Sequence, residues 1–246
     1  MDMIYNSTMK IVKKIVLALR FILLDQVFSM KIKKMSGGDY FIAETIPYQC
    51  QFATPELVAD ILEKRIKGED DPNWNNFGFP DREEYAYWSW RACGVACLKM
   101  VVDFYALAGK TIGELTYEGV KLGGYDVSAD RGWFYKPLLN QAQNYGLTGY
   151  TVSHFGIASI CELMKKKRFF VASVNPSLIR FDKTGVNEEP GGHLVLVIGC
   201  RVKSGAIEGF FIHNPSGKLD ETRRKTFIPI DVFNKAYSKK GIAIWR

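Results

Sequence analysis

Residues 93–107 carry the sequence CGVACLKMVVDFYAL, in which only Lys99 and Asp103 are charged. A helix that is apolar nearly all the way around packs inside a domain, so this stretch predicts a buried central helix that begins at Cys93. At a helix N-terminus, unpaired backbone N–H groups and the positive end of the helix dipole stabilise an anion. Cys93 therefore occupies a position that favours a thiolate, and Gly94 leaves room beside it.

The chain on both sides of this helix predicts an α+β fold. Upstream, Thr54 and Pro55 indicate the start of a helix over residues 57–62, and the turn-forming residues of 69–81 indicate an irregular surface loop. Downstream, the pattern predicts a helix that ends at Gly146 and then mainly apolar strands. These expected elements are a helix over 133–145, a strand over 148–153, a helix over 157–167 and a strand over 169–174. Three further strands are expected: one that begins at His193, one that ends at Asn214 and one around Phe227. Helices first and antiparallel strands later are typical of α+β proteins.

Composition limits the classes of protein to consider. The 246 residues are 47% hydrophobic, enough for a substantial core, and 33 basic against 26 acidic residues give a net charge of +7. Basic clusters at 31–34 and 165–168 occur without a nucleic-acid-binding motif, so we expect no nucleic-acid partner. Five cysteines are an odd number and include no Cys-x-x-Cys pair, so we expect reduced thiols, a cytoplasmic setting and no zinc.

The amino-terminal segment is set apart from the rest. Basic residues precede an apolar run that Arg20 and Asp25 interrupt, and the run is too short to span a bilayer. We expect an amphipathic helical appendage over residues 1–36 that packs on the domain or lies peripherally on a membrane surface, followed by the domain proper over 37–246. A true start at Met30 instead of Met1 is an alternative.

His193 begins a strongly apolar strand and Asn214 ends the next one. The midpoint of the two positions is 203.5, beside the turn-forming Lys203-Ser204-Gly205, so antiparallel pairing would bring their side chains together. A shift of one or two residues in register is compatible with the same arrangement. In this arrangement the Asn214 amide would orient the His193 imidazole toward a thiol.

At these residues the chain resembles the double-glycine leader peptidases that process bacteriocin precursors, and their stand-alone relatives, within the papain-like cysteine peptidases. The segments that carry the resemblance follow the order of the family: IPYQCQ, ACGVACLKM, NYGL, KKKRFFVASV, GGHLVLVIG and FIHNPSG. The resemblance implies a bacterial thiol protease of papain-like fold, with the Cys on a buried central helix and the His and Asn on an antiparallel sheet. It implies Cys93 as nucleophile, His193 as base and Asn214 as orienting residue, where the leader peptidases usually have aspartate.

The glutamine that donates to the oxyanion in this family precedes the cysteine closely, but here no glutamine lies just upstream of Cys93. The segment IPYQCQ resembles the one that carries it, so Gln51 is the candidate and Gln49 the second choice. An insertion of about forty residues between Gln51 and Cys93 would then have to loop out.

Three functions fit these residues. The first is a cysteine peptidase that acts on a peptide or protein without metal or cofactor, and the second is an acyltransferase that uses the same triad. The third is a non-catalytic peptide-binding domain, which the displaced glutamine favours. We interpret His213, adjacent to Asn214, and Cys97, one turn beyond Cys93, as structural residues, and His154 as a minor candidate for the cleft. The aromatic cluster of Tyr85, Tyr87, Trp88 and Trp90 is expected in the core or in the cleft wall.

Overall fold

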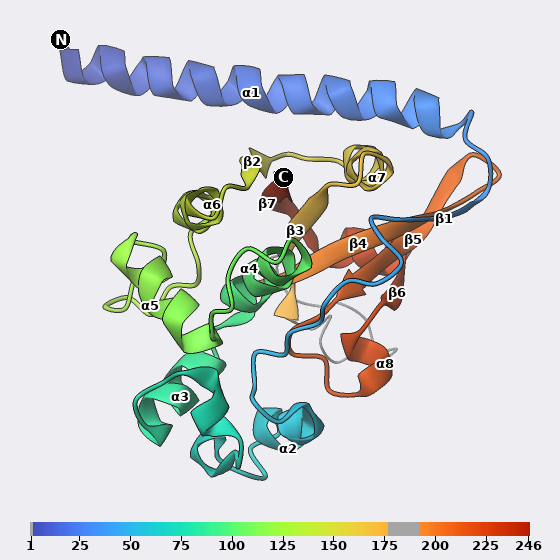
Figure 1. Ribbon diagram of the computed structural model, residues 1–246. Coiled ribbons are helices and arrows are strands. Elements are labelled where there is room, and N and C mark those ends of the chain that lie inside the picture. Colours follow the sequence, from blue (N-terminus) through green and yellow to red (C-terminus); the bar gives the residue numbers. More distant parts are fainter. Residues whose placement is uncertain (1, 177–191) are drawn as a thin grey trace.

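The computed structural model describes residues 2–176 and 192–246, and within the first helix it describes the side chains of residue 12 and of residues 15 onward (Figure 1). Met1, one of the two candidate starts, and Gly191, which opens a segment of the resemblance, lie outside the described residues. The α-helices are α1 (Asp2–Ile32), α2 (Val58–Leu62), α3 (Arg82–Ser89), α4 (Cys93–Phe104), α5 (Ile112–Lys121), α6 (Tyr135–Asn144), α7 (Ile157–Lys165), α8 (Asp220–Arg223) and α9 (Ile230–Ala236). The strands are β1 (Gly38–Phe41), β2 (Thr148–Ser153), β3 (Phe169–Val174), β4 (His193–Lys203), β5 (Ala206–His213), β6 (Thr226–Pro229) and β7 (Tyr237–Trp245).

The strands form one antiparallel sheet in the order β2-β7-β3-β4-β5-β6. The longest strand of the sheet is β4. Strand β3 pairs with the first half of β4, and β1 pairs with the second half of β4, from Gly199 to Val202, along the same edge. Every residue of β4 from His193 to Cys200 is buried. Because side chains alternate between the two faces of a strand, both faces of β4 are covered. The first residue of β4 is thus held in the interior of the molecule.

Helix α4 is the predicted central helix. Its buried residues run from Gly94 to Leu98 and from Met100 to Val102, and its first turn packs against β4. A Cβ on Gly94 would lie 3.0 Å from both Leu194 and Trp133, so only a residue without a side chain fits there without displacing a neighbour. The helix ends at Phe104 and not at Leu107, because Ala106 adopts a left-handed backbone with φ of 52°.

Residues 69–81 are mostly exposed and form neither α-helix nor strand, as predicted, but they are more ordered than an irregular loop. This region contains the 3₁₀ helices η2 (Gly68–Asp70) and η3 (Trp74–Phe77), and Asp71 and Phe77 within it are buried. The Asp71 carboxylate accepts hydrogen bonds from the backbone N–H and hydroxyl of Thr54 and from the Tyr85 hydroxyl. A buried carboxylate that gathers several donors gives an irregular segment a fixed structure.

Helix α1 lies along one side of the molecule, and its second half packs on α7 (Figure 1). Phe21 and Ile32 are buried, and the Phe21 ring meets Phe155 edge to face at 5.6 Å. The Asp25 carboxylate accepts hydrogen bonds from the backbone N–H and the hydroxyl of Ser159, at 2.7 and 2.8 Å. Helix α7 has no side-chain cap of its own, so α1 supplies a carboxylate to its N-terminus. Among the described residues, no helix has the length and apolar content needed to span a bilayer.

Candidate active site

Cys93 is the first residue of α4 and is partly exposed, whereas the four other cysteines are buried. Burial of the sulfur raises the pKa of the Cys93 thiol, and hydrogen bonds from the backbone N–H groups of Leu194, Gly94 and Cys93 itself oppose that rise. The contact with Leu194 places the sulfur next to the start of β4. The N–H groups of Cys93 and Gly94 are among those that a helix N-terminus leaves without internal partners, and the N–H group of Leu194 comes from β4.

His193 and Asn214 meet as the spacing predicted, in a shifted register. The ladder pairs Leu196 with His213, which puts Val195 opposite Asn214, two residues from His193. The His193 and Asn214 side chains bridge this diagonal, with Nε2 of His193 lying 2.9 Å from Oδ1 of Asn214. Diagonal neighbours in an antiparallel pair are within reach of long side chains.

The protonation of His193 follows from its hydrogen bonds. The backbone N–H of Ser216 donates to Oδ1 of Asn214 at 3.2 Å, which identifies that atom as the amide oxygen. An amide oxygen only accepts, so Nε2 of His193 carries the proton that it shares with Asn214. Nδ1 of the neutral ring is then the basic nitrogen. Burial lowers the pKa of His193 to about 4 against the opposing effect of the Asn214 hydrogen bond, so the imidazole is neutral at pH 7.

The turn after β5 is fixed from two directions. The buried Arg223 guanidinium donates to the carbonyls of Gly217 and Lys218 at 2.8 and 2.7 Å. From the other side, the Tyr48 hydroxyl donates to the carbonyl of Asn214 at 2.9 Å, and the backbone N–H of Gln51 donates to the carbonyl of Pro215 at 2.9 Å. The segment IPYQCQ therefore lies directly against the end of the strand that presents Asn214.

Cys93 and His193 line one cavity with a volume of about 350 Å³. Its other lining residues are Trp90, Arg91, Tyr125, Asp130, Gly132, Trp133, Tyr135, Ser173, Gly192 and Leu194. Within the aromatic cluster noted in the sequence, Trp90 lies in the cavity wall, while Tyr85 and Trp88 are buried in the core.

Several residues of this cavity escaped the sequence analysis. Arg91 forms a two-pronged ion pair with Asp130, with both N···O distances 2.6 Å, and the Tyr125 hydroxyl donates to the same carboxylate at 2.6 Å. The bonds from Arg91 and then Tyr125 lower the pKa of Asp130 to about 2, so this carboxylate is ionised at neutral pH. Also in the cavity lining, Tyr135 shares a hydrogen bond with the Ser173 side chain, and burial raises the pKa of the Tyr135 hydroxyl. Asp130, Tyr135 and Ser173 belong to separate elements, and no sequence motif links them.

Gln51, the candidate oxyanion donor, is buried, and its amide N–H donates to the carbonyl of Ser89 at 2.9 Å. Ser89 ends α3, four residues before Cys93. The two ends of the segment inserted between Gln51 and Cys93 therefore lie next to each other. Gln51 is not among the residues that line the cavity. The second choice, Gln49, donates to the carbonyl of Cys50 at 2.8 Å. Neither side chain points its amide at the cavity in this arrangement.

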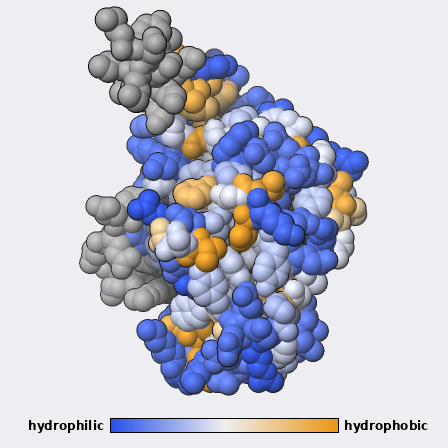
Figure 2. Space-filling view, turned by 90° about the vertical axis from the view of Figure 1, so that its left-hand side faces the viewer, coloured by the Kyte–Doolittle hydropathy of each residue, from blue (hydrophilic) through white to orange (hydrophobic). Residues whose placement is uncertain are grey.

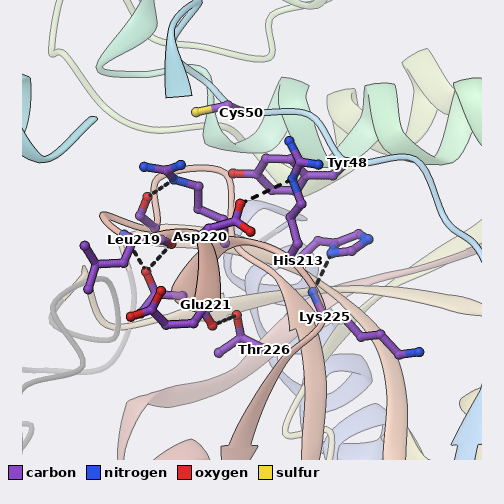
Figure 3. A network of polar contacts seen from close by, with 12 residues as sticks. Tyr48, Cys50, His213, Leu219, Asp220, Glu221, Lys225 and Thr226 are labelled. Atoms are coloured by element: carbon purple, nitrogen blue, oxygen red, sulfur yellow. Dashed lines mark hydrogen bonds and ion pairs between the residues drawn. The ribbon is translucent and has the colours of Figure 1, made fainter. Parts of the chain in front are cut away.

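His213 lies in a polar network away from the cavity (Figure 3). Its Nδ1 accepts from the backbone N–H of Lys225 at 3.0 Å, so its Nε2 donates to the carbonyl of Ile46 at 3.2 Å. Both ring nitrogens are engaged by backbone, which agrees with the structural interpretation. Cys97 is buried and contacts the carbonyl of Leu194, and neither Cys97 nor His154 lines the cavity. Among the described residues, no group of three His, Cys, Asp or Glu side chains is arranged to hold a metal ion.

A buried helix with a cysteine at its N-terminus, beside a histidine and an asparagine from an antiparallel sheet, is the arrangement of papain-like cysteine peptidases. The chain belongs to the Peptidase_C39-like family, whose model matches residues 73–242, or 170 of the 246 residues. The resemblance stated from the sequence is therefore confirmed, and membership supports a peptidase-type function. Gln51 lies upstream of the matched residues.

Solved structures of the same kind are similar at low identity. A protein from Bacillus anthracis described as a C39-like peptidase is 17% identical, with a TM-score of 0.42 over 63% of this chain and 89% of that one. A double glycine motif protease from an AMS/PCAT transporter, in complex with the leader peptide, is 16% identical, with a TM-score of 0.37 over 62% and 82%. The peptidase domain of Streptococcus ComA, a bifunctional ABC transporter of a quorum-sensing pathway, is 13% identical, with a TM-score of 0.42 over 63% and 91%. No curated protein matches the sequence.

Proposed function

We propose that the protein is a cysteine peptidase that hydrolyses a peptide bond through Cys93, His193 and Asn214. The observation that carries the proposal is the pair of hydrogen bonds on Oδ1 of Asn214, from Ser216 N–H and His193 Nε2–H. They assign the free lone pair of His193 to Nδ1, on a ring that shares a cavity with the Cys93 thiol. An unprotonated imidazole nitrogen beside a thiol is the base that a cysteine nucleophile requires.

The reaction follows in two halves. Nδ1 of His193 takes the thiol proton as Sγ of Cys93 attacks the carbonyl carbon, and the resulting tetrahedral oxyanion collapses as the amine leaves with that proton. Water then attacks the thioester carbon and gives one proton to His193. The C–S bond breaks, the carboxylic acid is released, and the proton on His193 returns to the sulfur of Cys93. The backbone N–H groups at the start of α4 are donors for the oxyanion, and a rotation of the Gln51 amide away from Ser89 would add another.

A second candidate is a peptide-binding domain without catalysis. The engagement of the Gln51 amide with Ser89 favours it, because loss of one oxyanion donor lowers a rate by about 10²-fold to 10³-fold. The cavity would be retained in either case.

The test is the rate of iodoacetamide alkylation at each cysteine, followed by peptide mapping from pH 5 to 9. We expect Cys93 to be labelled faster than the buried Cys97 at neutral pH, and His193→Ala to slow Cys93 at least tenfold while Cys97 is unchanged. His154→Ala is the matched control, since this histidine does not line the cavity. If His193→Ala leaves the Cys93 profile unchanged, the peptidase proposal fails and the peptide-binding domain is the better interpretation.

A further inference from the structure

Helix α1 has two apolar faces, and the domain covers only one of them. The inner face packs on the domain through Phe21, Leu24, Phe28 and Ile32. The hydrogen bonds between Asp25 and Ser159 fix the rotation of the helix about its axis. The second face is therefore held away from the domain by specific contacts.

This outer face of α1 consists of Val12, Val16, Leu19, Leu23, Val27 and Met30. Each of these side chains is between 42% and 61% exposed. At 3.6 residues per turn, the six fall within an arc of about 80° and extend over about 27 Å of the helix axis. Figure 2 looks nearly along α1 and shows a small apolar area at the top beside the grey atoms, with other apolar areas scattered over the body. A continuous apolar face of this size marks a site of interaction.

The charges of the helix select the kind of partner. From Met3 onward, Asp25 is the one acidic residue in the sequence of α1, and it is engaged with Ser159 on the inner side. The exposed charged residues beside the outer face, Arg20 and Lys31, are basic, and Lys33 and Lys34 follow the helix. A second copy of α1 would bring cations against cations and offers no exposed carboxylate to pair with them. A partner surface that carries negative charges above an apolar layer complements both the apolar outer face and the basic residues beside it.

We propose that the outer face of α1 lies in the plane of an anionic lipid bilayer and holds the domain at the membrane surface. Aliphatic side chains enter the boundary between headgroups and acyl chains, while the flanking arginine and lysines contact anionic headgroups. The outer face contributes no residue to the cavity that Cys93 and His193 share. This proposal rests on α1 alone and does not depend on the proposed activity.

The test is co-sedimentation of the full chain with vesicles of phosphatidylcholine alone or of phosphatidylcholine mixed with phosphatidylglycerol. We expect the wild-type protein to bind the anionic vesicles at least tenfold more tightly than the neutral ones, and added salt to weaken that binding. The double variant Leu19→Ser/Leu23→Ser should lose binding at least tenfold. The matched control Leu122→Ser/Val127→Ser removes exposed apolar side chains outside α1 and should bind as the wild type does. Both variants alter exposed positions, and an unchanged thermal unfolding midpoint would show that they are folded.

Three results would overturn the proposal. The first is absence of binding to anionic vesicles at low salt, and the second is equal loss in the Leu122→Ser/Val127→Ser control. The third is a dimer in analytical ultracentrifugation that Leu19→Ser/Leu23→Ser converts to a monomer while vesicle binding is absent. That outcome would assign the outer face to a second copy of the chain.

Discussion

The interaction of Asn214 with His193 makes a charge substitution informative. In Asn214→Asp, one carboxylate oxygen takes the place of the amide Oδ1 and continues to accept from Ser216 N–H and from Nε2–H of His193. The second carboxylate oxygen replaces the amide nitrogen at nearly the same volume. The substitution therefore adds one negative charge next to the imidazole and leaves the packing of the turn in place.

The expected effect is a rise in the pKa of His193, which burial holds at about 4. An opposite charge in hydrogen-bond contact raises the pKa of a basic group by about 1 to 3 units, so titration of His193 should move to between about 5 and 7. A more stable imidazolium also favours proton transfer from Cys93. The ultraviolet absorbance of the thiolate at neutral pH should therefore increase in the variant.

The measurement is an NMR titration of the imidazole signals in the wild type and in Asn214→Asp. His213 is an internal reference: burial lowers its pKa to about 4 as well, but both of its ring nitrogens contact backbone. We expect the signal of His193 to shift its midpoint and that of His213 to move by less than half as much. A His193 midpoint that stays at its wild-type value in a folded variant would refute the assignment of Asn214 as its partner.

Three further outcomes follow from the same contacts. His193 and His213 are both buried with pKa values lowered to about 4, so the folded state disfavours their charged forms. Their contribution to the free energy of unfolding, up to about 3 kcal/mol each, is present above pH 6.5 and is lost as pH falls toward 4. Urea unfolding midpoints between pH 7.5 and 4 should show this decline, and a flat profile would contradict it. Asp25→Ala removes both hydrogen bonds to Ser159 and should destabilise the protein by about 1 to 2 kcal/mol in chemical unfolding, whereas Asp25→Asn, which keeps one acceptor, should lose less. Gly94→Ala places a Cβ 3.0 Å from its neighbours and should cost about 1 to 3 kcal/mol; an unchanged free energy of unfolding would show that the first turn of α4 has more room than the contacts indicate.

Sequence reasoning succeeded where a local pattern decides the structure. The apolar stretch after Cys93 predicted α4, and the spacing from His193 to Asn214 predicted their contact. The register differs by two residues because the chain turns at Ser204 and Gly205, with Lys203 opposite Ala206, and not around position 203.5. Turn geometry sets register, and residue spacing alone does not specify it.

Two strands that the sequence analysis missed owe their structure to tertiary contacts. β7 has the sequence YSKKGIAIW, whose lysines and glycine weaken a strand pattern, yet it lies between β2 and β3 in the sheet. β1 has only four residues, and it is held in the sheet by its antiparallel pairing with β4. Packing and burial decide such strands more than intrinsic propensity does. The cavity residues Asp130, Tyr135 and Ser173 were missed for a related reason, since only the folded chain brings them together.

Burial has opposite consequences for the resting protein and for the proposed reaction. It raises the pKa of Cys93 and lowers that of His193, so the neutral thiol and neutral imidazole predominate at pH 7 when each group is considered alone. Transfer of one proton from sulfur to Nδ1 creates two opposite charges without changing the net charge of the cavity. Their attraction, together with the backbone donors around Cys93, offsets the burial that opposes each charge separately. We infer that the ion pair is a minor species that forms as Cys93 meets an electrophile, so His193 should assist alkylation of the free protein as well as the proposed attack on a peptide carbonyl.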